Sequence, residues 1–166
     1  MEFFNRRKRK GLTEYEAVKL MRERNHFGAM MVDLGYADAM ITGLTRSYRS
    51  TVRPLLQIIG LEKEVKTAAG MYILNTKRGP MFLADTTVNL NPTSNQIAEI
   101  TINVAKTIKK LKVQPKIALL SYSNFGSSPG PDSEKMAEAV KMLHSDQPGL
   151  IVDGELQANF ALNSDL

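Results

Sequence analysis

The sequence contains no cysteine. Disulfides, thiolate nucleophiles and zinc–thiolate sites are therefore excluded, and a reducing, cytoplasmic environment is the expected setting. No run of about 18 apolar residues is present, so we expect no membrane-spanning segment and no membrane partner. Residues 1–5 lack the basic start and apolar stretch of a secretory signal, and we expect no such signal.

Sequence motifs of several enzyme classes are also missing. Only two histidines occur, His26 and His144, and neither has a partner four residues away, so a metal site is not expected. Neither G-x-x-x-x-G-K-[ST] nor G-x-G-x-x-G is present, so the signatures of P-loop and dinucleotide-binding proteins are lacking. The G-x-S-x-G elbow of the α/β-hydrolases is absent too.

The composition favours a folded globular protein, with 43% hydrophobic and 23% charged residues in a chain of 166. This length suffices for one domain or two small lobes. The net charge is +5, and a run of basic residues occupies positions 6–10. The run suits either a nucleic-acid arm or a solvated stretch. Because no aromatic residue interleaves with it, we favour the solvated stretch and expect no nucleic-acid partner; a site for a small anion stays open.

The first third of the chain is expected to be mainly helical. Thr13 and Glu16 form a capping-box pattern at a helix start. A second apolar helix is predicted over 26–34, with Gly35 as its stop. A short buried strand is predicted over 38–42, followed by a polar loop over 44–50. The next helix is expected to hold Arg53 and Pro54 in its first turn and to end at Gly60.

Strands and helices alternate in the remainder. Two strands, 70–74 and 81–84, flank a turn at 77–80. A helix is predicted to start at Thr93, with Gln96 completing a capping box and Ile97, Ile100, Val104 and Ile108 directed inward. A strand at 116–121, a helix at 133–143 and a strand at 150–152 follow, with residues 153–155 as the exit loop. This alternation predicts an α/β sandwich with a largely parallel sheet, which binds ligands at the carboxyl ends of its strands.

Residues 121–128 form the first candidate site, because they link a buried strand to a helix. Such a loop presents free backbone N–H groups and a positive helix end. The hydroxyl groups of Ser121, Ser123, Ser127 and Ser128 add donors, and a phosphate or another oxyanion is the natural ligand. The alternative is an ordinary turn that caps its own helix.

Two further loops have the same placement. Residues 42–53 carry Thr42 and three arginines, including Arg46 and Arg53, and the guanidinium group grips phosphate or carboxylate well. The alternative is solvent-exposed arginines without a ligand. In the other loop, Asp153 and Glu155 flank a glycine and are suited to orienting a ligand or accepting a proton. The alternative, which we favour, is that they cap the next helix and pair with the arginines.

Several separated motifs occur together. They are Ala37–Gly43, Val52–Pro54, Phe82–Asn89, Ser121–Ser127 and Val152–Gln157. In this order they resemble the phosphate acetyltransferase family over nearly the whole chain after the basic start. Arg24–Met31, Asn124–Phe125 and Asn159–Ser164 are similar to the branch found at the C-terminus of large NADP-dependent malic enzymes.

The resemblance implies a two-lobed, three-layer α/β/α fold of the isocitrate/isopropylmalate dehydrogenase-like phosphotransacetylase type. Residues 1–62 would be a partial first lobe and residues 63–166 the second. The family transfers acetyl between CoA and phosphate, and the malic-enzyme branch implies sensing of acetyl-CoA. Acetyl-CoA, CoA or phosphate are thus the implied ligands, with none bound covalently. A homo-oligomer is implied, and the malic enzyme catalytic domain is the implied partner, which would itself hold NADP and a divalent metal.

The chain departs from the family pattern at the site. Free-standing enzymes of the family usually carry a Thr-Lys pair where this chain has Asn124 and Phe125. Bulky residues, among them Arg46 and Tyr48, replace small ones, and the Ser-Arg and Asp of the family's catalytic segment are not present. We therefore expect a truncated domain that binds its ligand without turning it over, the alternative being an active phosphate acetyltransferase. The expected ligand-binding residues are Thr42, Arg46, Arg53, Ser121, Ser123, Asn124, Gly126, Ser127, Ser128, Asp153 and Glu155; no catalytic residue is assigned.

Overall fold

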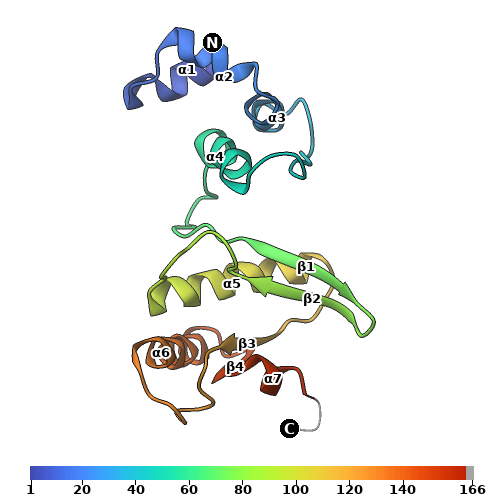
Figure 1. Ribbon diagram of the computed structural model, residues 1–166, viewed down its shortest axis with the longest axis vertical. Coiled ribbons are helices and arrows are strands. Elements are labelled where there is room, and N and C mark those ends of the chain that lie inside the picture. Colours follow the sequence, from blue (N-terminus) through green and yellow to red (C-terminus); the bar gives the residue numbers. More distant parts are fainter. Residues whose placement is uncertain (164–166) are drawn as a thin grey trace. The chain divides into compact units, whose positions relative to one another are not determined.

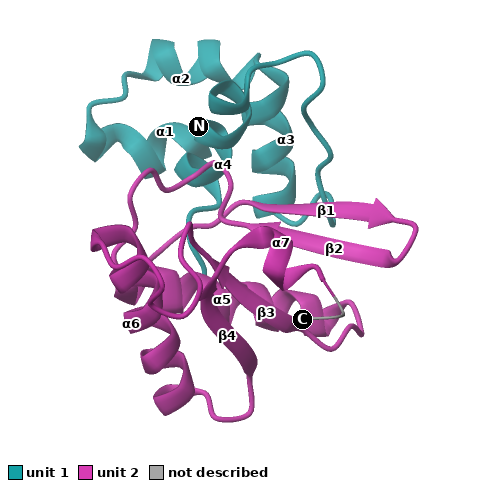
Figure 2. Ribbon diagram, turned by 60° about the horizontal axis from the view of Figure 1, so that its bottom comes forward, with its two compact units in different colours: residues 1–64 teal, residues 65–166 magenta. Residues whose placement is uncertain are grey.

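Residues 1–163 are described by the structure, a computed structural model. The chain divides into two compact units, Met1–Glu64 and Val65–Leu166, which Figure 2 colours separately. That the units correspond to the two lobes of the family fold stays a prediction. The end of the predicted motif at 159–164 lies outside the described residues.

Unit 1 is built from helices. They are α1 (Glu2–Arg7), the 3₁₀ helix η1 (Lys8–Lys10), α2 (Glu14–Met21), α3 (Arg24–Asp33) and α4 (Tyr48–Ile58), as Figure 1 shows. Each α-helix contributes to a small core of Phe3, Ala17, Ala29, Met30 and Ile58. The basic run at 6–10 belongs to α1 and η1, and Arg6 forms ion pairs with Glu2 at 3.0 Å and Asp33 at 2.5 Å.

The predicted helix signals at 13 and 35 are confirmed. The Thr13 hydroxyl accepts the Glu16 N–H, and the Glu16 carboxylate accepts the Thr13 N–H at 3.0 Å, which completes the capping box. Gly35 follows α3 with a φ of 76°, a left-handed conformation that glycine adopts without steric cost. Local sequence therefore sets these two helix ends.

The strand predicted over 38–42 is wrong. These residues form neither helix nor strand, and the side chain of Ile41 is fully exposed. A strand is stable only when a neighbouring strand accepts its hydrogen bonds and a core covers its apolar face. Unit 1 contains no other strand that would pair with this segment.

The predicted start of the third helix is also wrong. Helix α4 begins at Tyr48, because the Ser47 side chain accepts the Ser50 N–H and caps the helix. Pro54 consequently lies in the helix interior, not in the first turn. Proline lacks an N–H, so it leaves the carbonyl four residues earlier, that of Ser50, without its usual donor.

Unit 2 combines strands and helices. Its elements are β1 (Met71–Thr76), β2 (Gly79–Ala84), α5 (Ser94–Lys110), β3 (Lys116–Leu120), α6 (Pro131–Asp146), β4 (Ile151–Leu156) and α7 (Ala158–Ala161). Strands β1 and β2 form an antiparallel hairpin, whereas β3 and β4 form a parallel pair. The α/β class is therefore confirmed, but among the described residues the largely parallel sheet is replaced by two small sheets, since the hairpin's two-residue turn forces antiparallel pairing. The three-layer arrangement stays a prediction.

Helices α5 and α6 supply the core of unit 2. Ile97, Ala98, Ala139, Val140 and Leu143 from these helices pack with Leu119 of β3 and Val152 of β4. The predicted start of α5 is confirmed, because Thr93 and Gln96 form a second capping box. Ile97, Ile100 and Ile108 are buried as predicted, while Val104 is only half-buried.

Residues 153–155 were predicted as an exit loop, and this is wrong. They continue strand β4, where Asp153 pairs with Ala118 and Gly154 with Leu119. The register shifts between Leu119 and Leu120, so Leu120 pairs with Leu156. Glu155 therefore lies within the strand, and its side chain is buried. The glycine and carboxylates that suggested a loop instead form an irregular strand end.

Candidate functional site

The segment 121–128, called the serine loop, follows β3 and is held by one buried carboxylate. Glu155 is only 3% exposed and accepts the Ser123 hydroxyl at 2.9 Å and the Gly126 N–H at 2.6 Å. Ser123 is itself fully buried and accepts the Ser128 N–H at 3.1 Å. A carboxylate of one strand thus fixes the loop that follows the neighbouring strand.

Between residues 123 and 128, the remaining N–H groups of the serine loop are also engaged. Those of Ser123, Asn124 and Ser127 donate to Ser121 Oγ, Ser127 Oγ and the Asn124 carbonyl. The N–H of Phe125 donates to the Glu155 carbonyl at 2.8 Å. The expectation of free N–H groups is therefore corrected for residues 123–128, because their N–H groups already bond to the loop itself or to Glu155. Ligand binding by the loop's side chains stays a prediction.

The charge state of Glu155 follows from these contacts. The N–H of Gly126 lowers the pKa of Glu155 below its ordinary value; burial acts in the opposite direction, and the Ser123 hydroxyl adds to the lowering. The carboxylate is therefore ionised at neutral pH. The favoured alternative, in which this carboxylate caps the next helix and pairs with the arginines, is wrong in both respects: α7 has no side-chain cap, and Glu155 binds the serine loop and makes no ion pair with a described arginine.

Asn124 and Phe125, the pair that departs from the family pattern, have distinct contacts. The Asn124 side chain accepts the Gln157 N–H at 2.8 Å, which joins the loop to the end of β4. Phe125 adopts a φ of 47°, and its ring meets that of Phe160 edge-to-face at 6.3 Å. An aromatic contact therefore lies at the position where the resemblance implies a lysine.

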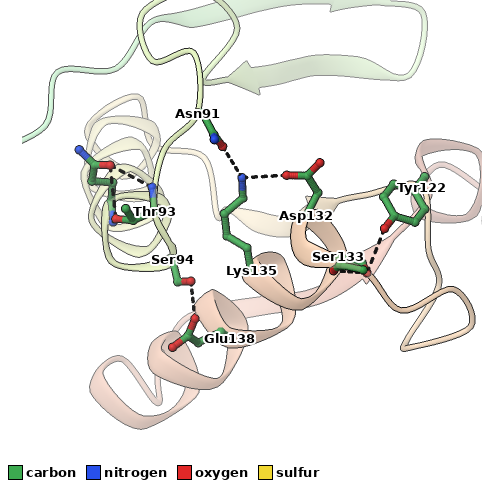
Figure 3. A network of polar contacts seen from close by, with 10 residues as sticks. Asn91, Thr93, Ser94, Tyr122, Asp132, Ser133, Lys135 and Glu138 are labelled. Carbon is green, nitrogen blue, oxygen red and sulfur yellow. Dashed lines mark hydrogen bonds and ion pairs between the residues drawn. The ribbon is translucent and has the colours of Figure 1, made fainter.

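The start of α6 is tied to the serine loop and to the start of α5, as Figure 3 shows. The Ser133 hydroxyl, almost fully buried, donates to the Ser128 or the Gly130 carbonyl, each at 3.0 Å. The Lys135 ammonium donates to Asn91 Oδ1 at 2.7 Å and contacts Asp132 at 3.1 Å. The Ser133 bond thus fixes the second end of the serine loop, while the Lys135 contacts link α6 to the segment before α5.

A second carboxylate holds the base of the hairpin. Asp85 accepts the N–H groups of Gly70, Val88 and Asn89, the last at 2.8 Å. Burial by itself raises the pKa of Asp85, but these donors and the Asn89 side chain together lower it. Residues 85–89 belong to the Phe82–Asn89 motif of the resemblance, and no site residue was predicted among them. An Asp followed by a polar segment is the signal of such a self-bonded turn.

In unit 1, one predicted residue, Thr42, is bound by Asn25, which was not predicted as a site residue. Its buried amide accepts the Thr42 hydroxyl at 2.7 Å and donates to the Ser50 carbonyl at 3.3 Å. That carbonyl is the one freed by Pro54. The sequence signal for this bond is Pro54, because a proline inside a helix leaves the carbonyl four residues earlier open to another donor. Arg46 approaches Glu23 at 3.9 Å between exposed side chains, an ion pair of little energetic weight.

The structure brings together most, but not all, of the predicted residues. In unit 2, Ser123 and Gly126 bond to Glu155 directly, and Ser127 and Ser128 contact Ser123. Asn124 bonds to Ser127 and Gln157. Ser121 lies at the loop's base, and the exposed Asp153 accepts the N–H of Gly154. Thr42, Arg46 and Arg53 belong to unit 1. Their convergence with the serine loop on one ligand stays a prediction.

The described residues were predicted to hold no metal site and no membrane span. No group of three or more His, Asp or Glu side chains is arranged to hold a metal ion there. Among the same residues, no helix is both long and apolar enough to cross a membrane.

The fold and the loop together define a class. Unit 2 is an α/β assembly whose hydroxyl-rich loop lies at the carboxyl end of a parallel strand, where such folds bind ligands. A family model described as "Phosphate acetyl/butaryl transferase" matches residues 1–166. The chain belongs to this family.

Relatives of two kinds are similar to it. The chain is 40% identical to the NADP-dependent malic enzyme of Haemophilus influenzae over 97% of its own length and 21% of that protein. It is also 40% identical to the phosphate acetyltransferase of Bacillus subtilis, over 96% of its own length and 49% of that protein. The crystal structure of a phosphotransacetylase from Streptococcus pyogenes matches with a TM-score of 0.85 and 37% identity, over 99% of this chain and 50% of that one. The chain thus spans half or less of these relatives.

Proposed function

We propose that this chain is a phosphate acetyltransferase-like module of a malic enzyme, and that it binds acetyl-CoA or phosphate in a regulatory role without catalysing acetyl transfer. Membership of the family and the similarity to the malic enzyme of Haemophilus influenzae support the choice of ligand and of partner domain. In this proposal NADP and a divalent metal bind to the malic enzyme domain, and the assembled protein is a cytoplasmic homo-oligomer.

The observation that carries the proposal is the side chain at position 125. The resemblance puts a lysine there in the active enzymes, where its charge would stabilise negative charge that develops in the transition state. In this chain the position holds Phe125, which packs against Phe160. The loop conformation is retained by Glu155, while the cation is absent at this position. That combination suits binding better than chemistry.

The serine loop would bind its ligand through side chains. Its N–H groups from Ser123 to Ser128 are engaged within the loop and with Glu155. The side chains of Ser127 and Ser128 are exposed, and each hydroxyl has one O–H group that can donate a hydrogen bond. In the proposal these two hydroxyls, supported by the rigid loop, contact phosphate oxygens.

A titration tests the proposal. Isothermal titration of acetyl-CoA, and separately of inorganic phosphate, into this chain should give saturable heat. The double substitution S127A/S128A should weaken binding about tenfold, because two charge-assisted hydrogen bonds are lost. The matched control is T107A/S145A, which removes two exposed hydroxyls from α5 and α6, outside the candidate loops. No heat at millimolar ligand, or an equal loss in both variants, contradicts the proposal.

Regulation is tested separately on the malic enzyme chain that contains this module. Acetyl-CoA should change malate turnover, because a ligand regulates only if it binds two states with different affinity. The S127A/S128A substitution should shift the concentration of acetyl-CoA that gives half of the effect. Turnover that is indifferent to acetyl-CoA would leave binding without regulation and would refute the regulatory part.

The second candidate is an active phosphate acetyltransferase. It is favoured by the TM-score of 0.85 to the phosphotransacetylase of Streptococcus pyogenes. The decisive assay follows formation of acetyl-CoA and phosphate from acetyl phosphate and CoA. We expect no turnover by this chain. Turnover that Arg53→Ala abolishes, while Arg49→Ala does not, would establish the enzyme and overturn the proposed function.

A further inference from the structure

A pocket of about 180 Å³ lies in unit 2, between the second half of α5 and the turn that joins α6 to β4. Its lining combines apolar and cationic side chains. They are Ile102, Ala105 and Leu150 as apolar lining, Lys106 and Lys109 as cations, and Gln147 as an uncharged polar group. An apolar lining beside ammonium groups is the chemistry that receives an organic anion.

The pocket has one wall that the sequence makes rigid. The Leu150 N–H donates to the Gln147 carbonyl at 2.9 Å, which closes a four-residue turn. Pro148 and Gly149 occupy its centre, and the proline ring fixes one of its backbone angles. A Cβ atom placed on Gly149 would meet nothing within 4 Å, so the space beside the turn is open. The side of the pocket at this turn is therefore not filled by other side chains.

The two lysines on this pocket have no internal counter-charge. Lys106 and Lys109 are three residues apart, so they share one face of α5. Within the part of the chain that the structure describes, neither forms an ion pair or a hydrogen bond, and Asp146 beside the turn pairs with neither. The dipole at the end of α5 accounts for Lys109 and Lys110, which lie in its last turn, but not for Lys106.

This pocket lies away from the serine loop. The turn at 147–150 precedes the amino end of β4, whereas the serine loop follows the carboxyl end of β3. Since β3 and β4 are parallel, the two features lie at opposite edges of the pair. The six residues of β4 span roughly 20 Å between those edges.

We propose that this pocket is a second ligand site that binds a small organic carboxylate with a short aliphatic chain. The carboxylate meets Lys106 and Lys109, and the aliphatic chain covers Ile102 and Ala105. The site is independent of the proposed function, because no residue is shared between the pocket and the serine loop.

The test uses ¹⁵N–¹H spectra of this chain during titration with sodium butyrate, with sodium chloride matching the ionic strength. We expect saturable shifts at the N–H groups of Gly149 and Leu150, with a Kd on the order of millimolar. The K106Q/K109Q variant should weaken binding about tenfold. The matched control, K110Q/K112Q, removes the same charge next to the pocket and should leave the Kd unchanged.

Each outcome decides. Absent shifts at Gly149 and Leu150, or an equal loss of affinity in the control, overturn the proposal. Inorganic phosphate should bind at least about fivefold more weakly than butyrate, since it cannot use the apolar lining. Equal binding of phosphate with the same response to K106Q/K109Q would show a general anion site and overturn the assignment of an organic ligand. Shifts confined to the serine loop would support the proposed function alone.

Discussion

Similar sequence patterns adopt different structures in the two units. In each, a short apolar run is followed by a loop rich in hydroxyl side chains. In unit 2 the run becomes β3, which pairs with β4, and the serine loop is bonded to Glu155. In unit 1 the run at 38–42 is not paired as a strand, and the side chain of Ile41 is exposed to solvent. An apolar run becomes a strand only where the fold supplies a neighbour.

The buried polar group that organises each unit also differs. Unit 2 uses a carboxylate that receives an N–H and a hydroxyl, whereas unit 1 uses the neutral amide of Asn25. Hydrogen bonds to a charged group are stronger, but losing them leaves a greater penalty. We therefore expect a substitution at the centre of unit 2, near Glu155, to lower stability more than a substitution of Asn25 in unit 1.

The largest effect is expected at Gly154, next to Glu155. Its φ is 141°, and a Cβ atom there would lie 2.6 Å from the Leu119 carbonyl oxygen. Gly154→Ala should therefore destabilise unit 2 by about 3 kcal/mol. Gly149→Ala is the control: its Cβ meets open space, and its cost should stay within about 0.5 kcal/mol. Urea denaturation, monitored by hydrogen exchange in peptides of each unit, measures the stability cost of both substitutions. Equal stability of the two variants would show that the close approach of residue 154 to the Leu119 carbonyl does not affect stability.

The next effect is expected at Glu155 itself. Glu155→Ala leaves the Ser123 hydroxyl and the Gly126 N–H without their acceptor and should cost about 2–3 kcal/mol. Asp153→Ala removes an exposed carboxylate two residues away and should change stability by less than about 0.5 kcal/mol. Hydrogen exchange should also rise at residues 123–128 in the first variant only. If both carboxylates cost the same, the loop does not depend on Glu155.

A smaller effect is expected at Asn25 in unit 1. Asn25→Ala removes the donor to the Ser50 carbonyl and should cost about 1–2 kcal/mol. Pro54→Ala restores a helical N–H to the same carbonyl. In the Pro54→Ala background, Asn25→Ala should therefore cost about 0.5–1 kcal/mol less. The four stabilities of this double-mutant cycle, measured by urea denaturation, test the coupling; strictly additive costs would show that the amide does not serve that carbonyl.

Local signals in the sequence predicted more of the fold than of the site. The capping boxes at Thr13 and Thr93 and the stop at Gly35 depend on neighbours within four residues, and all three are confirmed. Whether residues 38–42 form a strand, and which groups bond to Glu155, depends on contacts that are distant in sequence. The pattern at 153–155 showed two carboxylates but not which one is buried. Burial comes from pairing with β3, which no local window contains.

The smallest expected effect separates the units by pH. Burial lowers the pKa of His26 in unit 1 below its ordinary 6.5, so the unfolded state takes up its proton first as the pH falls. Unit 1 should therefore begin to lose stability as the pH drops through 6.5. In unit 2 the Gly126 N–H lowers the pKa of Glu155 below 4.5, and the stability that this carboxylate contributes is complete above 4.5 and lost only below it.

Urea denaturation at a series of pH values, followed by the loss of folded ¹⁵N–¹H peaks in each unit, measures both windows. His26→Phe should abolish the change near pH 6.5 in unit 1, because the ring that packs against Phe3 then carries no proton. Glu155→Gln should remove part of the acid sensitivity of unit 2 and leave unit 1 unchanged. If unit 2 loses stability together with unit 1 between pH 6.5 and 5, then a group other than Glu155 governs its response, and the contrast between a neutral and a charged organising centre fails.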